Sequence, residues 1–333
     1  MERVTLPNNT TVRGLGLISG GLDSMLAARL LMEQGIAVTG IAFVTPFFGS
    51  ANAEAAARRV GFPLIVRDIT APHLAMVKNP PSGYGSQMNP CIDCHALMLS
   101  VAGEIMDAEG FDFLFTGEVL NERPMSQSLR SLNRVANLSG RRGHVLRPLS
   151  ALRLEETTPE RERTVDRRRL LNLEGRSRRR QFELAARWGL TDYPSPAGGC
   201  LLTDPNFSRR LKDLLDRGPE AGEHDLELLK IGRQFRLSDG VKAAVGKNAA
   251  DNRALTSLRA PGDLLLRTSG VPGPVMIISG AADESDVAVA AGICARYSDG
   301  RAGKVRIVVE SDAGARELLA EPIAQEDLVA RRI

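Results

Sequence analysis

The chain of 333 residues lacks any hydrophobic run long enough to cross a membrane. Its most apolar stretches, such as residues 14–18 and 275–278, are far shorter than the roughly 18 residues that a helical span needs. The amino terminus also lacks the basic region, apolar core and small-residue cleavage site of a secretory signal. These absences exclude a membrane-spanning helix, leave no membrane partner to expect, and predict a cytoplasmic protein.

Cysteine is scarce too, with four residues in the whole chain. Four are too few for a disulfide scaffold at this length, and a reducing compartment would leave them as thiols or metal ligands. The composition of 43% hydrophobic and 25% charged residues provides enough apolar area for a core and excludes intrinsic disorder. We therefore expect a globular chain of two or three domains.

Lysine is the rarest basic residue, because arginine supplies 37 of the 43 basic side chains. A GC-rich genome would explain this ratio, but it would not explain how the arginines cluster. Residues 123–180 hold 16 Arg and no Lys against 6 acids, a net charge of +10 that leaves about −7 for the remaining chain. Guanidinium groups match phosphate oxygens, so this Arg-rich segment predicts a polyanionic partner.

The first half of the chain alternates strands and helices. An apolar, glycine-spaced run precedes a helical pattern, and the same alternation then repeats at a similar pace. This rhythm predicts an α/β domain with a doubly wound parallel sheet and a ligand site beyond the carboxyl ends of the strands. The expected elements are strands at 12–18, 36–44, 63–66 and 111–115, helices at 22–34, 51–60 and 91–108, and a loop at 78–90.

The second half changes character after Leu149. Arg-rich helices broken near Gly175 and Gly189 are expected first, then an irregular stretch and a short helix. From about residue 220 the pattern predicts a smaller α+β domain, with strands at 241–245, 263–267, 275–278 and 304–309 and a helix at 284–296. The expected divisions are 1–150 for ligand binding, 151–218 for the Arg-rich helical segment, and 219–333 for the last domain.

A glycine-rich hexapeptide, Ser19-Gly20-Gly21-Leu22-Asp23-Ser24, joins the first strand to the first helix. Backbone N–H groups and the helix dipole at such a turn can hold a phosphate, and glycine lets the backbone approach it closely. An ordinary turn capped by Ser or Asp would look similar, but the position, the glycine pair and the hydroxyls together favour a phosphate site. The absence of a Gly-Lys-Ser/Thr ending excludes an ordinary Walker loop.

Three of the four cysteines are candidate ligands. Cys91 and Cys94 form a Cys-x-x-Cys pair at the start of a helix, and Cys200 follows a pair of glycines. With no second Cys-x-x-Cys pair, these residues suit an iron–sulfur cluster with one open iron, or a zinc site completed by His95 or Asp93. Cys294 lies in an apolar run and is expected in the core.

Together these motifs resemble the PP-loop (ATP pyrophosphatase) tRNA thiolation enzymes, particularly the tRNA 2-thiouridylases, over about residues 12–217. The hexapeptide resembles their pyrophosphate loop, Thr116-Gly117-Glu118 their second nucleotide-side loop, and Asn89-Pro90-Cys91-x-x-Cys94 their first cysteine motif. Residues 198–207, Gly-Gly-Cys-Leu-Leu-Thr-Asp-Pro-Asn-Phe, resemble the segment around their second catalytic cysteine. Residues 232–255 resemble instead the RNA-binding domain of ribosome-rescue proteins of the fibronectin-binding-like class.

The resemblance implies the adenine nucleotide α-hydrolase type of fold and a reaction in which ATP adenylates a tRNA uridine carbonyl before sulfur replaces the oxygen. It implies tRNA and a sulfur donor as partners, and ATP, Mg²⁺ and a 4Fe-4S cluster as cofactors. Because Cys91 adds a third cysteine, the pattern resembles the cluster-dependent branch of these enzymes more than the members that use two cysteines in a persulfide relay. The implied ATP-binding residues are Ser19, Gly20, Gly21, Asp23, Ser24 and Gly117, the catalytic residues Asp23, Cys94 and Cys200, and the cluster ligands Cys91, Cys94 and Cys200.

Some choices stay open on sequence alone. Arg141, Arg142 and the arginines at 167–169 would contact the tRNA backbone, or else pair with nearby glutamates on a solvated surface. A sulfur transferase for a small molecule or cofactor, and a non-catalytic RNA-binding protein, are the alternative functions. The modified nucleotide, the sulfur donor and the oligomeric state, with a homodimer as one option, are also open.

Overall fold

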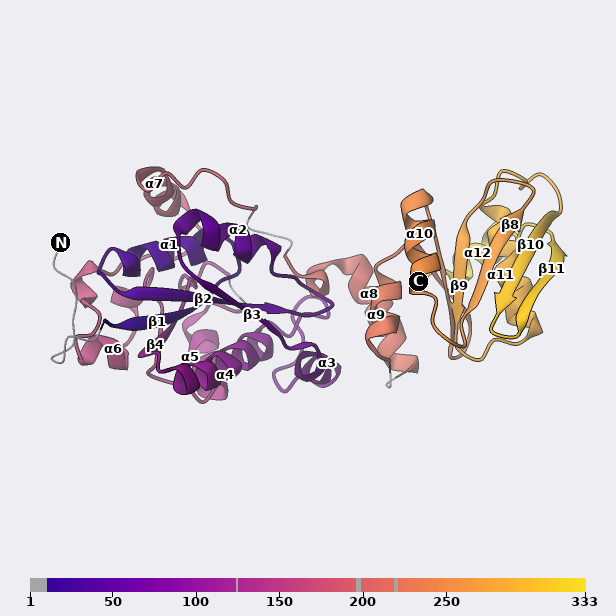
Figure 1. Ribbon diagram of the computed structural model, residues 1–333. Helices are drawn as coiled ribbons and strands as arrows, with labels where there is room; N and C mark the ends of the chain where they lie inside the picture. The colour runs from indigo at the N-terminus through magenta and orange to yellow at the C-terminus, as the bar shows by residue number, and fades with distance from the viewer. Residues whose placement is uncertain (1–10, 124, 196–198, 219–220) are drawn as a thin grey trace. The chain divides into compact units, whose positions relative to one another are not determined.

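The computed structural model describes residues 11–123, 125–195, 199–218 and 221–333. Residues 1–10, on which the absence of a secretory signal was judged, lie outside these ranges. Gly198 of the motif around Cys200 also lies outside them. The chain divides into two compact units, one ending at Thr203 and the other running from Asp204 to Ile333 (Figure 1). Within the described residues, no helix combines the length and the apolar character that a bilayer crossing requires.

The described part of the first unit contains a five-stranded parallel sheet, which confirms the predicted α/β class. Glycines and β-branched or aromatic residues fill the central strands, and almost every side chain there is buried. The strand order is β3-β2-β1-β4-β5. The strands are β1 (Arg13–Leu17), β2 (Ala37–Val44), β3 (Leu64–Asp68), β4 (Phe113–Thr116) and β5 (Val145–Leu146).

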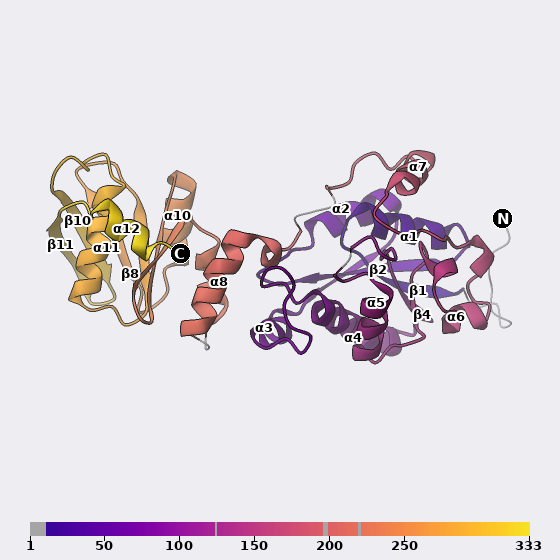
Figure 2. The same ribbon diagram turned by 180° about the vertical axis from the view of Figure 1, so that it is seen from behind.

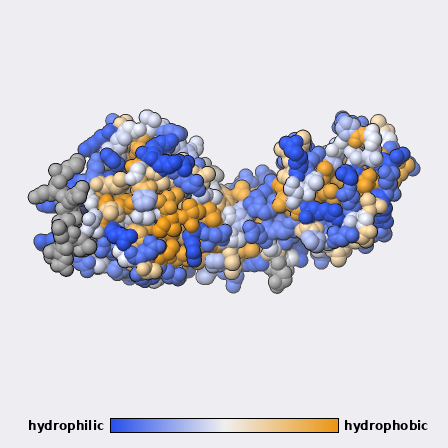
Figure 3. Space-filling view, viewed as in Figure 1, coloured by the Kyte–Doolittle hydropathy of each residue, from blue (hydrophilic) through white to orange (hydrophobic). Residues whose placement is uncertain are grey.

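Helices cover both faces of this sheet, as a doubly wound fold requires. Figure 1 shows α1 and α2 on one face and α3, α4 and α5 on the other. Apolar residues gather on the surface over β2 and the edge strand β3, where Val66 is exposed (Figure 3). The helices are α1 (Leu22–Met32), α2 (Ala51–Val60), α3 (Thr70–Lys78), α4 (Cys91–Glu109), α5 (Leu129–Leu138), α6 (Thr158–Arg161) and α7 (Arg179–Arg187).

The carboxyl edge of the sheet is the expected place for a ligand. From β1 the chain proceeds outward to β2 and β3, and it later returns to β4 and β5 on the other side of β1. The strand order therefore reverses between β1 and β4, and open α/β sheets bind ligands at such a point. The loop after β1 and the loop after β4 meet there, since Gly117 approaches the backbone of Asp23 and Ser24.

Two segments of the first unit differ from the sequence-based expectation. Helix α3 was not expected, because its sequence TAPHLAMVK shows no clear apolar face. Between residues 151 and 178, short helical turns replace the expected Arg-rich helices. There part of the backbone bonds to the segment that follows β5, for example from Leu171 N–H to the Pro148 carbonyl and from Leu173 N–H to the Leu149 carbonyl.

The second unit holds an antiparallel six-stranded sheet, as expected for a separate α+β domain. Apolar side chains of the strands alternate between two core clusters, so the sheet is buried on both faces. Helices α11 and α12 lie together over one face (Figure 2). The strands, in the order β11-β10-β8-β9-β7-β6, are β6 (Arg233–Ser238), β7 (Val241–Val245), β8 (Leu264–Ser269), β9 (Val275–Ser279), β10 (Val305–Ser311) and β11 (Gly314–Ala320).

The helices of the second unit frame this sheet. Leu255 of α10 packs on Ile277 and Leu265, on the face opposite α11. Cys294 of α11 is fully buried, which confirms its expected place in the core. The helices are α8 (Pro205–Arg217), α9 (Glu223–Leu229), α10 (Ala249–Leu258), α11 (Glu284–Arg296) and α12 (Gln325–Arg331).

Candidate functional site

The glycine-rich hexapeptide forms the turn between β1 and α1 at the carboxyl edge of the sheet. The Ser24 hydroxyl donates a hydrogen bond to the Gly21 carbonyl at 2.8 Å, and the Gly21 N–H donates to Ser19 Oγ at 3.3 Å. No side chain caps the start of α1 in the described structure. The first-turn N–H groups and the helix dipole can therefore serve an anion.

Two glycines are required for this geometry. Gly20 has a φ of +80°, and a Cβ there would lie 2.2 Å from the backbone carbon of Asn52 in α2. A Cβ on Gly117 would lie 2.5 Å from the Ser24 nitrogen and 2.6 Å from the Asp23 carbonyl carbon. The loop after β4 thus packs directly against the backbone of the first turn of α1. Any larger residue at position 117 would displace that turn.

Asp23 faces an arginine that the sequence analysis did not single out. Arg178 Nη2 lies 3.2 Å from Asp23 Oδ2, and Arg178 Nε lies 3.3 Å from Glu122 Oε1. Burial raises the pKa of Asp23 although Arg178 opposes this effect, and burial together with the charge of Asp23 raises the pKa of Glu122. Two carboxylates that repel each other are therefore held beside the phosphate loop by one guanidinium group.

Glu118, next to Gly117, belongs to a buried ion cluster. Its carboxylate contacts Arg147 Nε at 2.9 Å, His95 Nδ1 at 3.0 Å and Thr116 Oγ1 at 3.0 Å. Burial alone would raise the pKa of Glu118, but Arg147 and His95 outweigh it and lower this pKa to about 2. The ionised carboxylate fixes the first turn of α4, which carries His95, against the carboxyl end of β4.

Cys91, Cys94 and Cys200 converge at the same edge, and we call them the thiol cluster. Leu201 N–H donates to the Phe47 carbonyl at 3.0 Å, which anchors the segment of Cys200 beside the loop that follows β2. Burial raises the pKa of Cys94, and the charges of Cys200 and Cys91 raise it further. Burial likewise raises the pKa of Cys200 to about 11, with Cys91 adding to the effect. Phe47, which anchors the segment of Cys200, also packs against the ring of His73, and His73 contacts Cys94.

His73 of α3 is a member of this site that the sequence analysis missed. Its Nε2 lies 3.3 Å from Cys94 Sγ. The ring is fully buried against Phe47 and Phe48, with centroids 5.5 and 5.3 Å away, and burial lowers its pKa to about 4. A neutral imidazole therefore contacts the Cys94 thiol. An aromatic pair followed some 25 residues later by a lone histidine gives no sequence signal for this contact.

The two residues considered for completing a zinc site have other partners. His95 binds Glu118, and the Asp93 carboxylate accepts hydrogen bonds from the Ser82 N–H at 2.7 Å and hydroxyl at 2.6 Å. In the part of the chain that the structure describes, no group of three or more His, Cys, Asp or Glu side chains is arranged to hold a metal ion. The side chains as they stand thus place the three thiols together without forming a finished coordination sphere.

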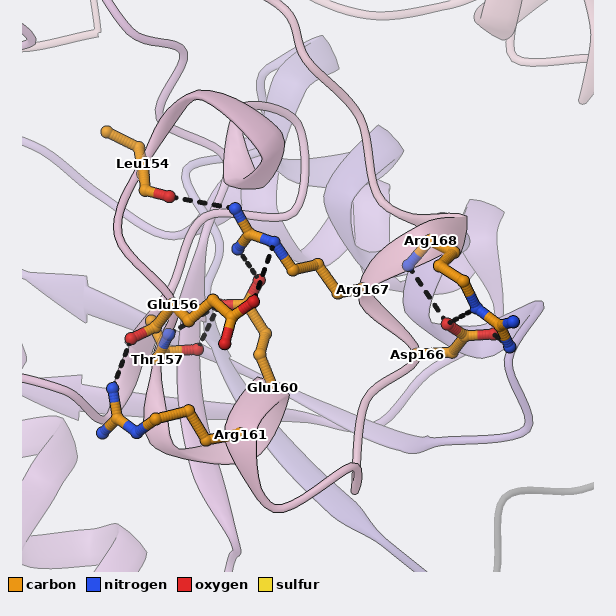
Figure 4. Close-up of polar contacts among 8 residues, drawn as sticks. All are labelled: Leu154, Glu156, Thr157, Glu160, Arg161, Asp166, Arg167 and Arg168. Atoms are coloured by element: carbon orange, nitrogen blue, oxygen red, sulfur yellow. Dashed lines mark hydrogen bonds and ion pairs between the residues drawn. The ribbon is translucent and has the colours of Figure 1, made fainter.

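The arginines expected to contact tRNA are paired with acids. Arg141 binds Asp107 at 2.7 Å, and Arg142 lies 3.8 Å from Glu155. Figure 4 shows Arg167 pointing toward Glu156 and Glu160, and Arg168 folded onto Asp166. Arg142 and Arg168 are exposed, so their ion pairs are weak. Arg167 instead binds the buried Glu160, and Arg169 donates to the Glu33 carbonyl at 2.6 Å. Contact of these arginines with tRNA therefore stays a prediction.

Comparison with protein families gives two matches. Residues 9–158 match the family model described as thiamine biosynthesis protein (ThiI), and residues 232–331 match the NFACT protein RNA-binding domain. A probable tRNA sulfurtransferase of Anoxybacillus flavithermus is 29% identical over 44% of this chain. A tRNA sulfurtransferase of Desulfurococcus amylolyticus is 25% identical over 64% of it. The chain spans only 37% and 41% of the length of these curated relatives.

Solved structures give weaker likenesses. A complex of a 4-thiouridine synthetase with RNA and bound ATP aligns with 66% of this chain and 52% of its own, at 21% identity and a TM-score of 0.37. The C-terminal part of the fibronectin/fibrinogen-binding protein of Streptococcus suis aligns with 38% of this chain and 67% of its own, at 15% identity and a TM-score of 0.28. The two family matches confirm both resemblances inferred from the sequence. The chain is thus similar to the ThiI family over residues 9–158 and to the NFACT-type RNA-binding domain over residues 232–331.

Proposed function

We propose that this protein is an ATP-dependent tRNA sulfur transferase, which adenylates a uridine carbonyl and replaces its oxygen with sulfur. One observation carries the proposal: the phosphate loop and the thiol cluster occupy the same carboxyl edge of one parallel sheet. The loop follows β1, Cys91 and Cys94 open α4 beside the end of β4, and Cys200 is anchored beside the end of β2. An adenylating centre and a sulfur-handling centre are thereby brought onto one substrate.

In the first step, the hexapeptide binds the phosphates of ATP through the start of α1. Gly20 and Gly21 allow close approach of the backbone, and Ser19, Ser24 and Gly117 shape the loop. The carboxylates of Asp23 and Glu122 lie beside it, and oxygen ligands of this kind fit Mg²⁺. The uracil carbonyl oxygen attacks the α-phosphorus, the bond to the pyrophosphate group breaks, and the adenylated base gains AMP as a leaving group.

In the second step, sulfur displaces AMP from the base carbon. Cys94 and Cys200 are the proposed catalytic thiols. One of them would take the outer sulfur of a persulfide carrier protein, whose own cysteine leaves as a thiolate, and the new persulfide would then attack the adenylated base. Alternatively, Cys91, Cys94 and Cys200 would be the three cysteine ligands of a 4Fe-4S cluster with one iron free of protein ligands. Such a cluster, when bound, supplies an open iron that can hold sulfide. The neutral His73 ring places its Nε2 within 3.3 Å of Cys94 Sγ, on the buried side of the site.

The substrate we propose is tRNA, and the cytoplasm is its proposed location. The match of residues 232–331 to an RNA-binding domain and the net charge of +10 over residues 123–180 both support an RNA substrate. A small-molecule sulfur transferase would need neither feature. Sedimentation velocity of the full chain tests the homodimer that the sequence left as an option.

The decisive experiment measures pyrophosphate and AMP release from ATP, with and without unmodified tRNA. We expect release to require tRNA and to be lost in Asp23→Asn, because this carboxylate lies at the phosphate loop. Asp166→Asn is the matched control, since the Asp166 carboxylate binds Arg168, two positions along the chain, and lies outside the phosphate loop. Release that is independent of tRNA would favour a small-molecule substrate, and no release under any condition would leave a non-catalytic RNA-binding protein.

A further inference from the structure

A cavity of about 310 Å³ lies between α4, α5 and the loop that precedes α4. It adjoins the first turn of α4, where Cys91 and Cys94 are found. The motifs behind the proposed chemistry do not use any of its residues. We call it the Arg-lined pocket, and its lining residues are Pro81, Ser82, Ile92, Arg130, Ser131 and Arg134.

The charge of this pocket is not balanced by acids. Arg130 and Arg134 are one helical turn apart on the same face of α5, where two like charges disfavour the helix. Both side chains are exposed, and neither forms an ion pair with any residue in the described ranges. By contrast, Arg179 and Arg180 in the same Arg-rich segment both pair with Glu183, at 3.1 and 3.8 Å. An unbalanced pair of guanidinium groups in a pocket fits a bound anion.

Hydrogen bonds connect the pocket to the helix of the thiols. Arg134 Nε donates to Ser82 Oγ at 2.9 Å, and Ser82 Oγ donates to Asp93 Oδ1 at 2.6 Å. Asp93 is buried between Cys91 and Cys94 in the first turn of α4. This chain of contacts uses Nε of Arg134, so its two outer nitrogens can donate to a ligand. It also holds the ligand close to the site of sulfur chemistry.

Local sequence explains why the two arginines project from α5. Ser128 caps the helix by accepting the Ser131 N–H at 3.1 Å, which sets where the helix begins. Leu132 and Val135 then face the core, so Arg130 and Arg134 face outward. The apolar side chains of Pro81 and Ile92 line the pocket as well. Two arginine forks beside a small apolar surface suit one nucleotide, with phosphate on the arginines and sugar on the apolar side.

We propose that the Arg-lined pocket binds a backbone phosphodiester of the tRNA next to the nucleotide that enters the thiol site. The inference rests on the proposed tRNA substrate and gives it a specific point of contact. Arg130 and Arg134 bind the phosphate, and Ser82 orients Arg134. The pocket sets the register of the RNA strand relative to the thiol cluster.

The test compares two double variants of the full chain in binding to an unmodified tRNA transcript over a series of salt concentrations. We expect R130Q/R134Q to weaken binding roughly tenfold to a hundredfold and to reduce the slope of log K against log salt by about 1 to 2. R179Q/R180Q removes the same charge from paired arginines and should weaken binding by less than about threefold. All four arginine side chains are on the surface, so both variants should fold.

The competing outcomes are separable. Equal losses in the two variants, or tRNA affinity unchanged in R130Q/R134Q, would overturn the proposal. Unchanged tRNA affinity with slower sulfur transfer from a persulfide carrier would point to a protein contact instead. ATP affinity should not change in R130Q/R134Q, and a fall in it alone would assign the pocket to the nucleotide phosphates. A third outcome separates the two proposals. If R130Q/R134Q weakens tRNA binding as expected but the wild type does not thiolate tRNA, the proposed function is contradicted and the proposed phosphate contact at the pocket still holds.

Discussion

Glu118→Gln removes the negative charge from the buried ion cluster at the carboxyl edge of the first unit. The substitution keeps the size of the side chain but leaves the Arg147 guanidinium without a counter-charge. The two side chains are only 7% and 8% exposed, so solvent does not replace the lost partner. Breaking a buried pair in this way costs about 3–5 kcal/mol. The fall of the Glu118 pKa from 4.5 to about 2 independently corresponds to roughly 3 kcal/mol.

Urea denaturation followed by tryptophan fluorescence measures this effect. Trp188 is the only tryptophan, and it packs on the core of the first unit, so its signal reports on that unit alone. We expect the midpoint of Glu118→Gln to fall by roughly 1 to 2 M urea. Glu183→Gln is the matched control, because Glu183 forms exposed pairs with Arg179 and Arg180 that contribute less than about 1 kcal/mol. Equal midpoints for the two variants would refute the reasoning.

The same variant has a distinct pH dependence. A carboxylate whose pKa is lowered on folding contributes its full stability above the unfolded value of 4.5 and loses it as the pH falls toward 2. The stability difference between wild type and Glu118→Gln should therefore be constant above pH 4.5 and shrink below it. A difference that stays constant down to pH 2 would mean that the Glu118 charge does not stabilise the fold.

Three further predictions concern the proposed function. Gly117→Ala should weaken ATP binding at least tenfold in calorimetry and lower the melting temperature of the unit, because the new Cβ would displace the Ser24 backbone; unchanged ATP affinity would remove this loop from the nucleotide site. Protein purified without oxygen should be brown, and replacing any cysteine of the thiol cluster by Ser should remove iron and colour whereas Cys294→Ser keeps both; stoichiometric zinc in place of iron and acid-labile sulfide would contradict the cluster. A chain that ends at Thr203 should keep ATP binding and lose tRNA affinity, and equal tRNA binding by the short and full chains would contradict a role of the second unit in RNA capture.

The short repeating units of the first domain could be predicted from the sequence, because their signals are local. Strand, glycine turn and helix follow one another within residues 12–60, and the helix at Ala51–Val60 begins and ends as predicted. The C-terminal helix at Glu284–Arg296 does so as well. In each case an apolar period or a glycine at the end decides the structure without help from distant residues.

The rest of the site depends on contacts between distant parts of the chain. Arg178 meets Asp23 from 155 positions away, and nothing in its Arg-rich surroundings marks it out from its neighbours. His73 contacts Cys94 only because the unexpected α3 packs against α4. The Arg-rich helices expected between residues 151 and 178 were wrong for a related reason, whereas α7 lies between Gly175 and Gly189 as expected. Asp166 binds Arg168 and Glu160 binds Arg167, so these side chains are not paired along a helix. The backbone of residues 151–178 bonds in part to other segments of the chain.

The separation of the cysteines along the chain has a consequence during synthesis. Cys91 and Cys94 leave the ribosome together, but the structure brings Cys200 to them only through the Leu201 contact with Phe47. At translation rates of about 5–20 residues per second, roughly 5 to 20 s pass before the third thiol follows. For that interval the nascent protein carries an open pair of thiols on a half-built domain. Any metal or sulfur loaded then would find an incomplete set of ligands, so maturation of the thiol cluster belongs after release of the first unit from the ribosome.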